Sequence, residues 1–287
     1  MLERQERESS KVNNVVQITR DRKVSFLEDT KIRYPDLWLG IYLFGPSSEA
    51  APFPEHLARA ACFKADTPDE ADIVLFLGGS DINPILYGKK PHLSTRFNEV
   101  RDRDDMLMYS YCLERGIPMY GICRGAQFLW VMNGGELYQD VDGHHGDHAM
   151  WDRINNRMIP RVSSVHHQQC KETPGMNEPE ILGTVHGKAR KRWSDNQVYR
   201  EDPIPEIEAY FIRETCCLGI QGHPEYRNYH EFAEWSFKRI EHHITHNPDL
   251  DYPKEATELN PKRRLRIKPD LLAQRKLGWD ITKKEAC

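Results

Sequence analysis

Apolar residues along the chain gather in short runs separated by longer amphipathic segments. The run at residues 206–212 and the run at 215–221 are joined by Arg213-Glu214, which predicts a hairpin. Because strand-like and helical segments alternate, the pattern predicts an α/β fold, a doubly wound, mostly parallel sheet flanked by helices. The runs predicted as strands span 37–44, 71–77, 117–122, 206–212 and 215–221, and helical spacing covers 54–63, 98–115, 125–132 and 226–244.

Both ends of the chain differ from this pattern. Residues 1–33 are polar and charged without a sustained apolar period, which predicts an N-terminal arm. We expect one domain over residues 34–245 and a basic C-terminal extension over 246–287. Residues 260–287 carry nine Lys and Arg against three Asp and Glu. We interpret this end as a solvated arm packed on the domain; the alternative is a docking tail for an acidic partner or nucleic acid.

Composition narrows the class of protein. The 40 basic and 44 acidic residues leave a formal charge of −4, which argues against a nucleic-acid partner. No apolar run approaches the ~20 residues of a membrane span, and the N-terminus lacks the apolar centre of a signal peptide. The seven cysteines show no disulfide or zinc spacing, which indicates reduced thiols and a cytoplasmic protein.

A cysteine lies at the turn between a predicted strand and a predicted helix. The segment Gly121-Ile122-Cys123-Arg124-Gly125 has the nucleophile-elbow pattern, with cysteine in place of serine. Glycines tolerate the tight turn, and the helix N-terminus favours a thiolate at Cys123. The alternative is a buried structural cysteine.

A base for this thiol is present far downstream. His223-Pro224-Glu225 ends an apolar strand, and residues two apart in an extended segment point to the same side. A thiol nucleophile needs a base, and the base needs a carboxylate to orient it. Cys123, His223 and Glu225 therefore form a candidate catalytic triad. The competing interpretation of His-Pro-Glu alone is an exposed polar loop.

With both motifs present, residues 34–245 resemble the class I glutamine amidotransferase superfamily. The closer likeness is to its branch of γ-glutamyl peptide hydrolases and γ-glutamyl-γ-aminobutyrate hydrolases. That likeness also depends on the segments 78–84, 87–88, 121–127 and 164–168.

The resemblance implies roles for further residues. It places the oxyanion donors at the backbone amides of Gly79 and Arg124. It implies substrate binding by Gln127 and by the segment Ser164, Val165 and His166. His166 or His167 has a competing role as a core or rim hydrogen-bonding residue.

Two charged segments receive non-catalytic interpretations. Residues 143–148 contain three histidines and an aspartate, which are metal-ligand types, but they stand in a glycine-rich stretch without regular spacing. We interpret them as a polar loop and expect no metal and no cofactor. The charge run at residues 101–105 is interpreted as a solvated helix face.

The expected function is hydrolysis of a γ-glutamyl amide, glutamine or a γ-glutamyl amine, through a γ-glutamyl thioester. A first alternative is a glutaminase that supplies ammonia to a separate synthetase or ligase partner. A second is a non-catalytic binding or assembly protein on the same fold. The expected ligand is a small γ-glutamyl substrate, with no membrane partner.

Overall fold

The computed structural model describes residues 37–185, 191–194, 197–200, 205–245, 250–251 and 266–267 of the chain. The predicted N-terminal arm lies outside them. The predicted C-terminal extension is described only at β15 (Leu250–Asp251) and β16 (Arg266–Ile267), which pair with each other. The domain boundaries therefore stay predictions.

A nine-stranded sheet forms the centre of the molecule, in the order β2-β1-β3-β4-β14-β13-β10-β7-β8. From β2 to β14 neighbouring strands are parallel, and from β14 to β8 they are antiparallel. The α/β fold class is confirmed, and the sheet has a parallel half and an antiparallel half. Its strands are β1 (Gly40–Phe44), β2 (Phe63–Lys64), β3 (Ile73–Phe76), β4 (Met119–Ile122), β7 (His148–Asp152), β8 (Arg157–Val162), β10 (Pro179–Val185), β13 (Glu206–Ile212) and β14 (Cys217–Ile220).

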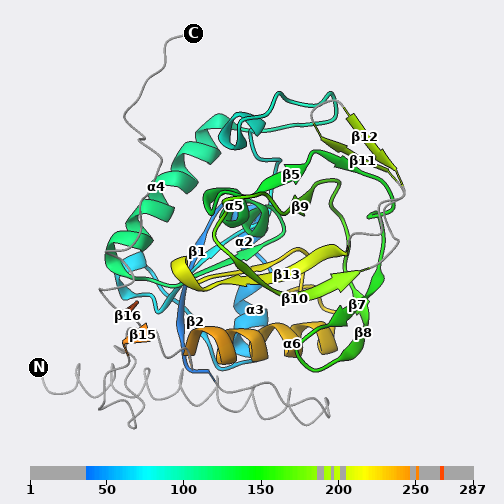
Figure 1. Cartoon of the computed structure of the whole chain (residues 1–287). Coiled ribbons are helices and arrows are strands. Elements are labelled where there is room, and N and C mark those ends of the chain that lie inside the picture. Colours follow the sequence, from blue (N-terminus) through cyan, green and yellow to red (C-terminus); the bar gives the residue numbers. More distant parts are fainter. Residues whose placement is uncertain are drawn as a thin grey trace, which may run out of the picture.

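Helices cover both faces of the sheet. Figure 1 shows α4 and α5 on one face and α3 and α6 on the other. The short α2 precedes α3, and single turns follow several strands. The bounds are α2 (Ser47–Ala50), α3 (Phe53–Ala58), α4 (Glu99–Arg115), α5 (Arg124–Met132), α6 (His230–Ile240), the 3-10 turns η1 (Pro68–Glu70), η2 (Pro84–Tyr87) and η3 (Arg213–Thr215), and the π turn η4 (Glu241–Thr245).

The buried strand β3 supplies both cores. Ile73 and Leu75 belong to the core under α3 and α6, whereas Val74 and Phe76 belong to the core under α4 and α5. Successive side chains of a strand point to opposite faces, so a continuous apolar run is what a strand covered on both sides requires. This explains why the sequence shows runs there rather than alternation.

Two smaller sheets lie beside the main one. β6 (Asp140–Val141) pairs with β11 (Lys191–Ser194), which pairs with β12 (Gln197–Arg200). β5 (Glu136–Tyr138) pairs with β9 (Gln169–Lys171). The apolar pattern did not predict β7, β8 or β10, which are short or only partly buried.

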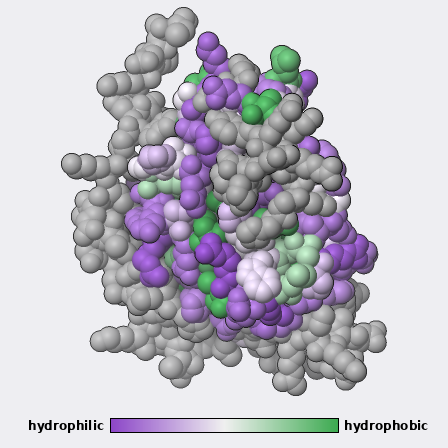
Figure 2. Space-filling view, turned by 45° about the vertical axis from the view of Figure 1, so that its right-hand side comes forward, coloured by the Kyte–Doolittle hydropathy of each residue, from purple (hydrophilic) through white to green (hydrophobic). Residues whose placement is uncertain are grey.

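The described surface is largely polar on the face drawn in Figure 2, where apolar residues form small separate groups. Scattered exposed apolar side chains are ordinary on a protein surface. None of the described helices combines the length and the apolar character that a bilayer span requires.

Candidate active site

Cys123 lies at the turn from β4 to α5, where the prediction places it. Its backbone has φ 52° and ψ −113°, a left-handed conformation that side-chain-bearing residues rarely adopt. The Cys123 amide donates to the Ile220 carbonyl at 2.9 Å, which holds the turn against β14. The thiol side chain is partly exposed and stands at the N-terminus of α5, where the helix dipole favours a negative sulfur.

Glycines on both sides of Cys123 allow the close packing of α5. A Cβ at Gly121 would lie 2.5 Å from the Gly125 carbonyl carbon, and one at Gly125 would lie 2.0 Å from the Phe76 oxygen. Both separations are far below van der Waals contact, so any side chain would push α5 away from β3 and β4. The two glycines of the motif are therefore explained by packing rather than by their own torsions.

His223 lies between a carboxylate and the thiol. Its Nδ1 is 2.6 Å from Glu225 Oε1, and its side chain also hydrogen-bonds that of Cys123. With Nδ1–H donated to Glu225, Nε2 is the nitrogen left for the sulfur. The structure thus brings together the three residues of the predicted triad, whose catalytic roles stay predictions.

The electrostatics of this group favour an ion pair. Burial of the His223 ring disfavours its charged form, but the Cys123 thiolate and the Glu225 carboxylate outweigh burial and raise the pKa of His223 to about 11. An imidazolium beside the sulfur stabilises the thiolate. The arrangement therefore places a positive charge beside the Cys123 sulfur.

Two residues that the sequence did not reveal fix the histidine. The Ser163 hydroxyl accepts a hydrogen bond from the His223 amide at 2.6 Å. The Tyr226 ring stacks on the imidazole at a centroid distance of 4.7 Å and an angle of 6°. Signals for both were present, since Ser163 precedes the predicted binding segment and Tyr226 directly follows His-Pro-Glu.

Gly79, the first predicted oxyanion donor, lies next to the side chain of Arg124, the second. A Cβ at Gly79, whose φ is 141°, would lie 3.5 Å from Arg124 Cδ. Within the described residues, neither the Gly79 amide nor the Arg124 amide donates a hydrogen bond to another protein group. Both N–H groups are thus available, which supports the prediction without testing it.

The charge run at residues 101–105 is only partly a solvated helix face: the side chains of Arg103 and Asp104 are exposed, but the prediction was wrong for Asp102 and Asp105. Asp102 and Asp105 are buried on α4 and bind the buried guanidinium of Arg124. Arg124 Nη2 lies 2.5 Å from Asp102 Oδ1, and Arg101 Nε lies 2.8 Å from Asp105 Oδ1. The pairing anchors the first residue of α5 to α4, since buried charges persist only when paired.

A further carboxylate stands near the thiol. A Cβ built at Gly78 would lie 3.4 Å from His223 Cε1, 3.5 Å from Glu49 Oε2 and 3.8 Å from Cys123 Cβ. Glu49 comes from the short helix α2, and no motif in the sequence singled it out. Three side chains from distant parts of the chain therefore converge beside the glycine turn.

The predicted substrate-binding residues fall into two groups. Gln127 and Ser164 are buried and engaged internally: Gln127 Nε2 donates to the Gln168 carbonyl at 3.0 Å, and Ser164 Oγ donates to the His144 carbonyl at 2.8 Å. Val165 is exposed. His166 is buried and turned toward His144, with ring centroids 4.5 Å apart. The binding roles of all four stay predictions.

His167 hydrogen-bonds two carboxylates, as its competing interpretation as a rim hydrogen-bonding residue predicts. Its Nε2 lies 3.0 Å from Asp81 Oδ1 and its Nδ1 lies 3.1 Å from Asp140 Oδ1. The hydrogen bond to Asp81 outweighs partial burial and raises the pKa of His167. A histidine held between two carboxylates joins the segment at Asp81 to β6.

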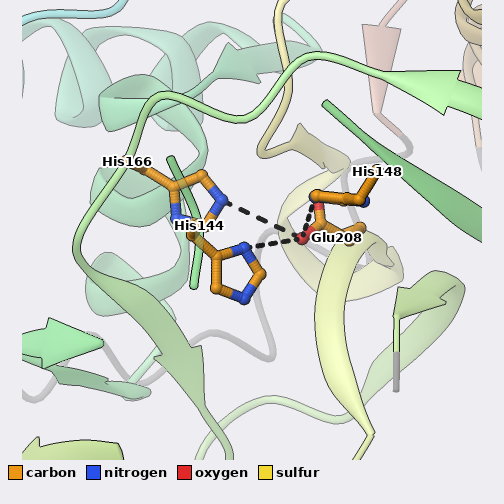
Figure 3. Close-up of side chains that lie close together, drawn as sticks. All are labelled: His144, His148, His166 and Glu208. Atoms are coloured by element: carbon orange, nitrogen blue, oxygen red, sulfur yellow. Dashed lines mark ion pairs between the residues drawn. The ribbon is translucent and has the colours of Figure 1, made fainter. Parts of the chain in front are cut away.

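The segment 143–148, interpreted above as a polar loop, is only partly exposed. His145, Gly146 and Asp147 are exposed, but His144 and His148 are buried. Figure 3 shows these two rings and that of His166 directed toward Glu208 of β13. Sequence reasoning missed Glu208, although Glu206 and Glu208 at alternate positions of an apolar strand indicate carboxylates on one buried face.

The fold and the cysteine elbow with its His-x-Glu pair define a class I glutamine amidotransferase-like protein. The chain belongs to the Peptidase C26 family, whose family model matches residues 60–225. The predicted resemblance is thereby confirmed. Members of a peptidase family are amide-bond hydrolases.

Individual relatives agree with this assignment. The glutamine amidotransferase-like protein YvdE of Lactococcus lactis is 39% identical over 163 residues, 54% of this chain and 66% of that protein. The protein NtpR of Enterococcus hirae is 33% identical over 55% of this chain and 68% of its own length. The γ-glutamyl-γ-aminobutyrate hydrolase PuuD of Escherichia coli is 27% identical over 69% of this chain and 82% of its own length. The match to YvdE thus spans slightly less than two thirds of that relative.

Proposed function

We propose that the chain hydrolyses a γ-glutamyl amide bond through a thioester on Cys123. The observation that carries the proposal is the contact of Cys123, at a left-handed elbow, with a His223 ring that is itself bound to Glu225 at 2.6 Å. A thiolate, a positioned proton carrier and a carboxylate orienter are the parts that acyl transfer requires. The γ-glutamyl specificity is supported by the name of the Escherichia coli relative.

The first half of the reaction forms the thioester. The Cys123 sulfur attacks the γ-carbonyl carbon, and the carbonyl π electrons move to the oxygen. The amides of Gly79 and Arg124 donate to this oxyanion. When the tetrahedral intermediate collapses, the C–N bond breaks and the leaving nitrogen takes the proton from His223.

The second half releases the product. Neutral His223 takes a proton from a water molecule, whose oxygen attacks the thioester carbon. Collapse of the second intermediate breaks the C–S bond, so the acid leaves and the thiolate returns beside an imidazolium. Glu225 orients the ring in every step through its hydrogen bond to Nδ1.

A mass-spectrometric assay tests this function. The purified chain is incubated with a panel of γ-glutamyl amines and with glutamine, and the products and any acyl-enzyme are identified by their masses. We expect release of the amine, and a loss of about 10⁴-fold or more in turnover for Cys123→Ala. Cys62→Ala is the matched control, since this thiol is buried. Equal turnover by Cys123→Ala and the unmodified chain would refute the nucleophile.

The same assay separates the alternatives. Turnover of γ-glutamyl amines by the chain alone supports a stand-alone hydrolase. Weak turnover of glutamine that rises strongly with cell extract indicates an ammonia-supplying partner of a synthetase. No turnover of any substrate, with Cys123 unreactive toward iodoacetamide, indicates a binding or assembly protein.

A further inference from the structure

We propose that His144, His148, His166 and Glu208 bind one zinc ion, in a structural site separate from the candidate triad. Their ligand atoms lie within 4.8 Å of one another (Figure 3). Three imidazoles and one carboxylate are a donor set typical of Zn²⁺. Because all four positions are taken by the protein and the residues are buried, the site has the closed form of a structural zinc.

The spacing of the ligand atoms fits tetrahedral coordination. At Zn–N and Zn–O lengths of about 2.0–2.1 Å, the corners of a tetrahedron are about 3.3–3.4 Å apart. Glu208 Oε1 lies 3.4 Å from His148 Nε2, 3.7 Å from His144 Nδ1 and 3.9 Å from His166 Nε2. These three separations exceed the tetrahedral edge by at most about 0.6 Å, and all four ligand atoms lie within 4.8 Å of one another, so rotations of the side chains must bring the nitrogens closer together around one ion.

The other nitrogen of each ring is already held. His144 Nε2 is 2.8 Å from Glu206 Oε2, His166 Nδ1 is 2.9 Å from the Gln168 carbonyl, and His148 Nδ1 is 3.2 Å from the Ala149 carbonyl. Metal-binding histidines show this arrangement, because an outer carboxylate or carbonyl fixes the tautomer and leaves the remaining nitrogen as a ligand. The pair of His144 with Glu206 is a carboxylate–histidine unit of this kind.

The charge of Glu208 also favours a cation. The carboxylate is buried, and three ring nitrogens face its Oε1, of which His148 Nε2 is the nearest at 3.4 Å. His166 Nε2 is without a hydrogen-bond partner among the described residues. A buried carboxylate that faces ring nitrogens needs a positive charge, which either a metal ion or a protonated histidine supplies.

A zinc ion at this position would also connect the proposed site to the residues that hold His223. The ligands come from the segment before β7, from β7, from the segment after β8 and from β13. The Gln221 amide donates to the Glu208 carbonyl at 2.8 Å, two residues before His223. Ser164, next to the Ser163 that holds the His223 amide, donates to the His144 carbonyl. The ion would therefore stabilise the strands of the antiparallel half that adjoin β14, the strand that precedes His223.

The test measures zinc binding independently of activity. It uses the full chain without a histidine tag, in a Cys123→Ala background, because Cys123 and His223 are themselves a possible zinc-binding pair. After dialysis against a chelator, ZnCl₂ is titrated in competition with a chromophoric chelator. We expect one equivalent of tightly bound Zn²⁺, a rise in the melting temperature, and the visible spectrum of tetrahedral Co²⁺ when Co²⁺ replaces zinc.

Variants separate this site from a simple ion pair. Glu208→Gln and His144→Ala should each lower the zinc affinity by at least about 100-fold, and Glu206→Gln, outside the ligand set, by about 10- to 100-fold. His145→Ala, an exposed neighbour, should bind zinc like the parent chain. If the parent chain takes up no stoichiometric zinc, or if Glu208→Gln and His145→Ala bind it equally, Glu208 is paired with a protonated histidine and the proposal is wrong. Zinc uptake by the parent chain remains decisive even where a variant fails to fold.

Discussion

The two halves of the central sheet carry clusters of similar side chains in different settings. At the end of the parallel half, His223 meets one carboxylate and a partly exposed thiol on a strained backbone. In the antiparallel half, three buried histidines converge on the buried carboxylate of Glu208. The first arrangement leaves the Cys123 sulfur partly exposed, whereas the second directs one nitrogen of each ring to one enclosed point. Access and backbone strain, rather than residue type, separate a candidate catalytic group from a candidate structural one.

The largest expected effect concerns the anchoring of the parallel half. Asp105→Asn removes a charge partner from the buried guanidinium of Arg124, and breaking a buried ion pair costs about 3–5 kcal/mol. We expect the free energy of unfolding, measured with urea, to fall by about that amount. Asp104→Asn on the exposed side of α4 is the control, with a change within about 0.5 kcal/mol. Zinc binding in the other half should survive in both variants; equal stability of the two would contradict the anchoring role.

An intermediate effect is expected for the ion pair of the triad. The raised pKa of His223 means that its imidazolium persists across neutral pH and up to about pH 11. It therefore keeps a positive charge beside the Cys123 sulfur over that range. His223→Ala should lower the iodoacetamide alkylation rate of Cys123 at pH 7 by about tenfold and move the profile to that of an ordinary cysteine.

The control for this experiment is His242→Ala, at an exposed histidine of η4. Its alkylation profile should match that of the unmodified chain. A profile for His223→Ala that is unchanged between pH 5 and 9 would show that His223 does not tune the thiol.

The smallest expected effect concerns the aromatic ring of Tyr226, which lies next to the triad. Tyr226 stacks on His223, and aromatic pairs contribute about 0.5–1.5 kcal/mol. Tyr226→Leu should reduce kcat/KM by about two- to tenfold, mainly through kcat, because the imidazole is less well oriented. Tyr226→Phe keeps the ring and should keep the rate. Identical kinetics for the two variants would mean that the stack does not position His223.

The local parts of the candidate site were predictable because each is contiguous in sequence. Within residues 117–132, an apolar run and two glycines predict the strand, turn and helix around Cys123. His223 and Glu225 are two residues apart in an extended segment with a proline between them, which predicts that their side chains point to the same side. In both cases the spacing alone determines which side chains share a face.

The parts that were missed depend on contacts between distant segments. The partners Asp102 and Asp105 stand in a run of alternating charges, which has the same appearance whether it is solvated or buried against Arg124. The ligands of the proposed zinc site come from separate segments with no common spacing, and Glu208 is 60 positions from His148 (208 − 148). Only the order of the strands in the sheet brings them together.

The contact between Gly125 and Phe76 has a mechanical consequence. Because a Cβ at Gly125 would lie 2.0 Å from the Phe76 carbonyl oxygen, α5 packs directly on the backbone of β3, and Gly79 follows Phe76 by three residues. Any displacement of α5 relative to β3 would change the separation of Cys123 from the glycine turn, so the packing of these two elements sets the spacing between the proposed nucleophile and its proposed amide donors.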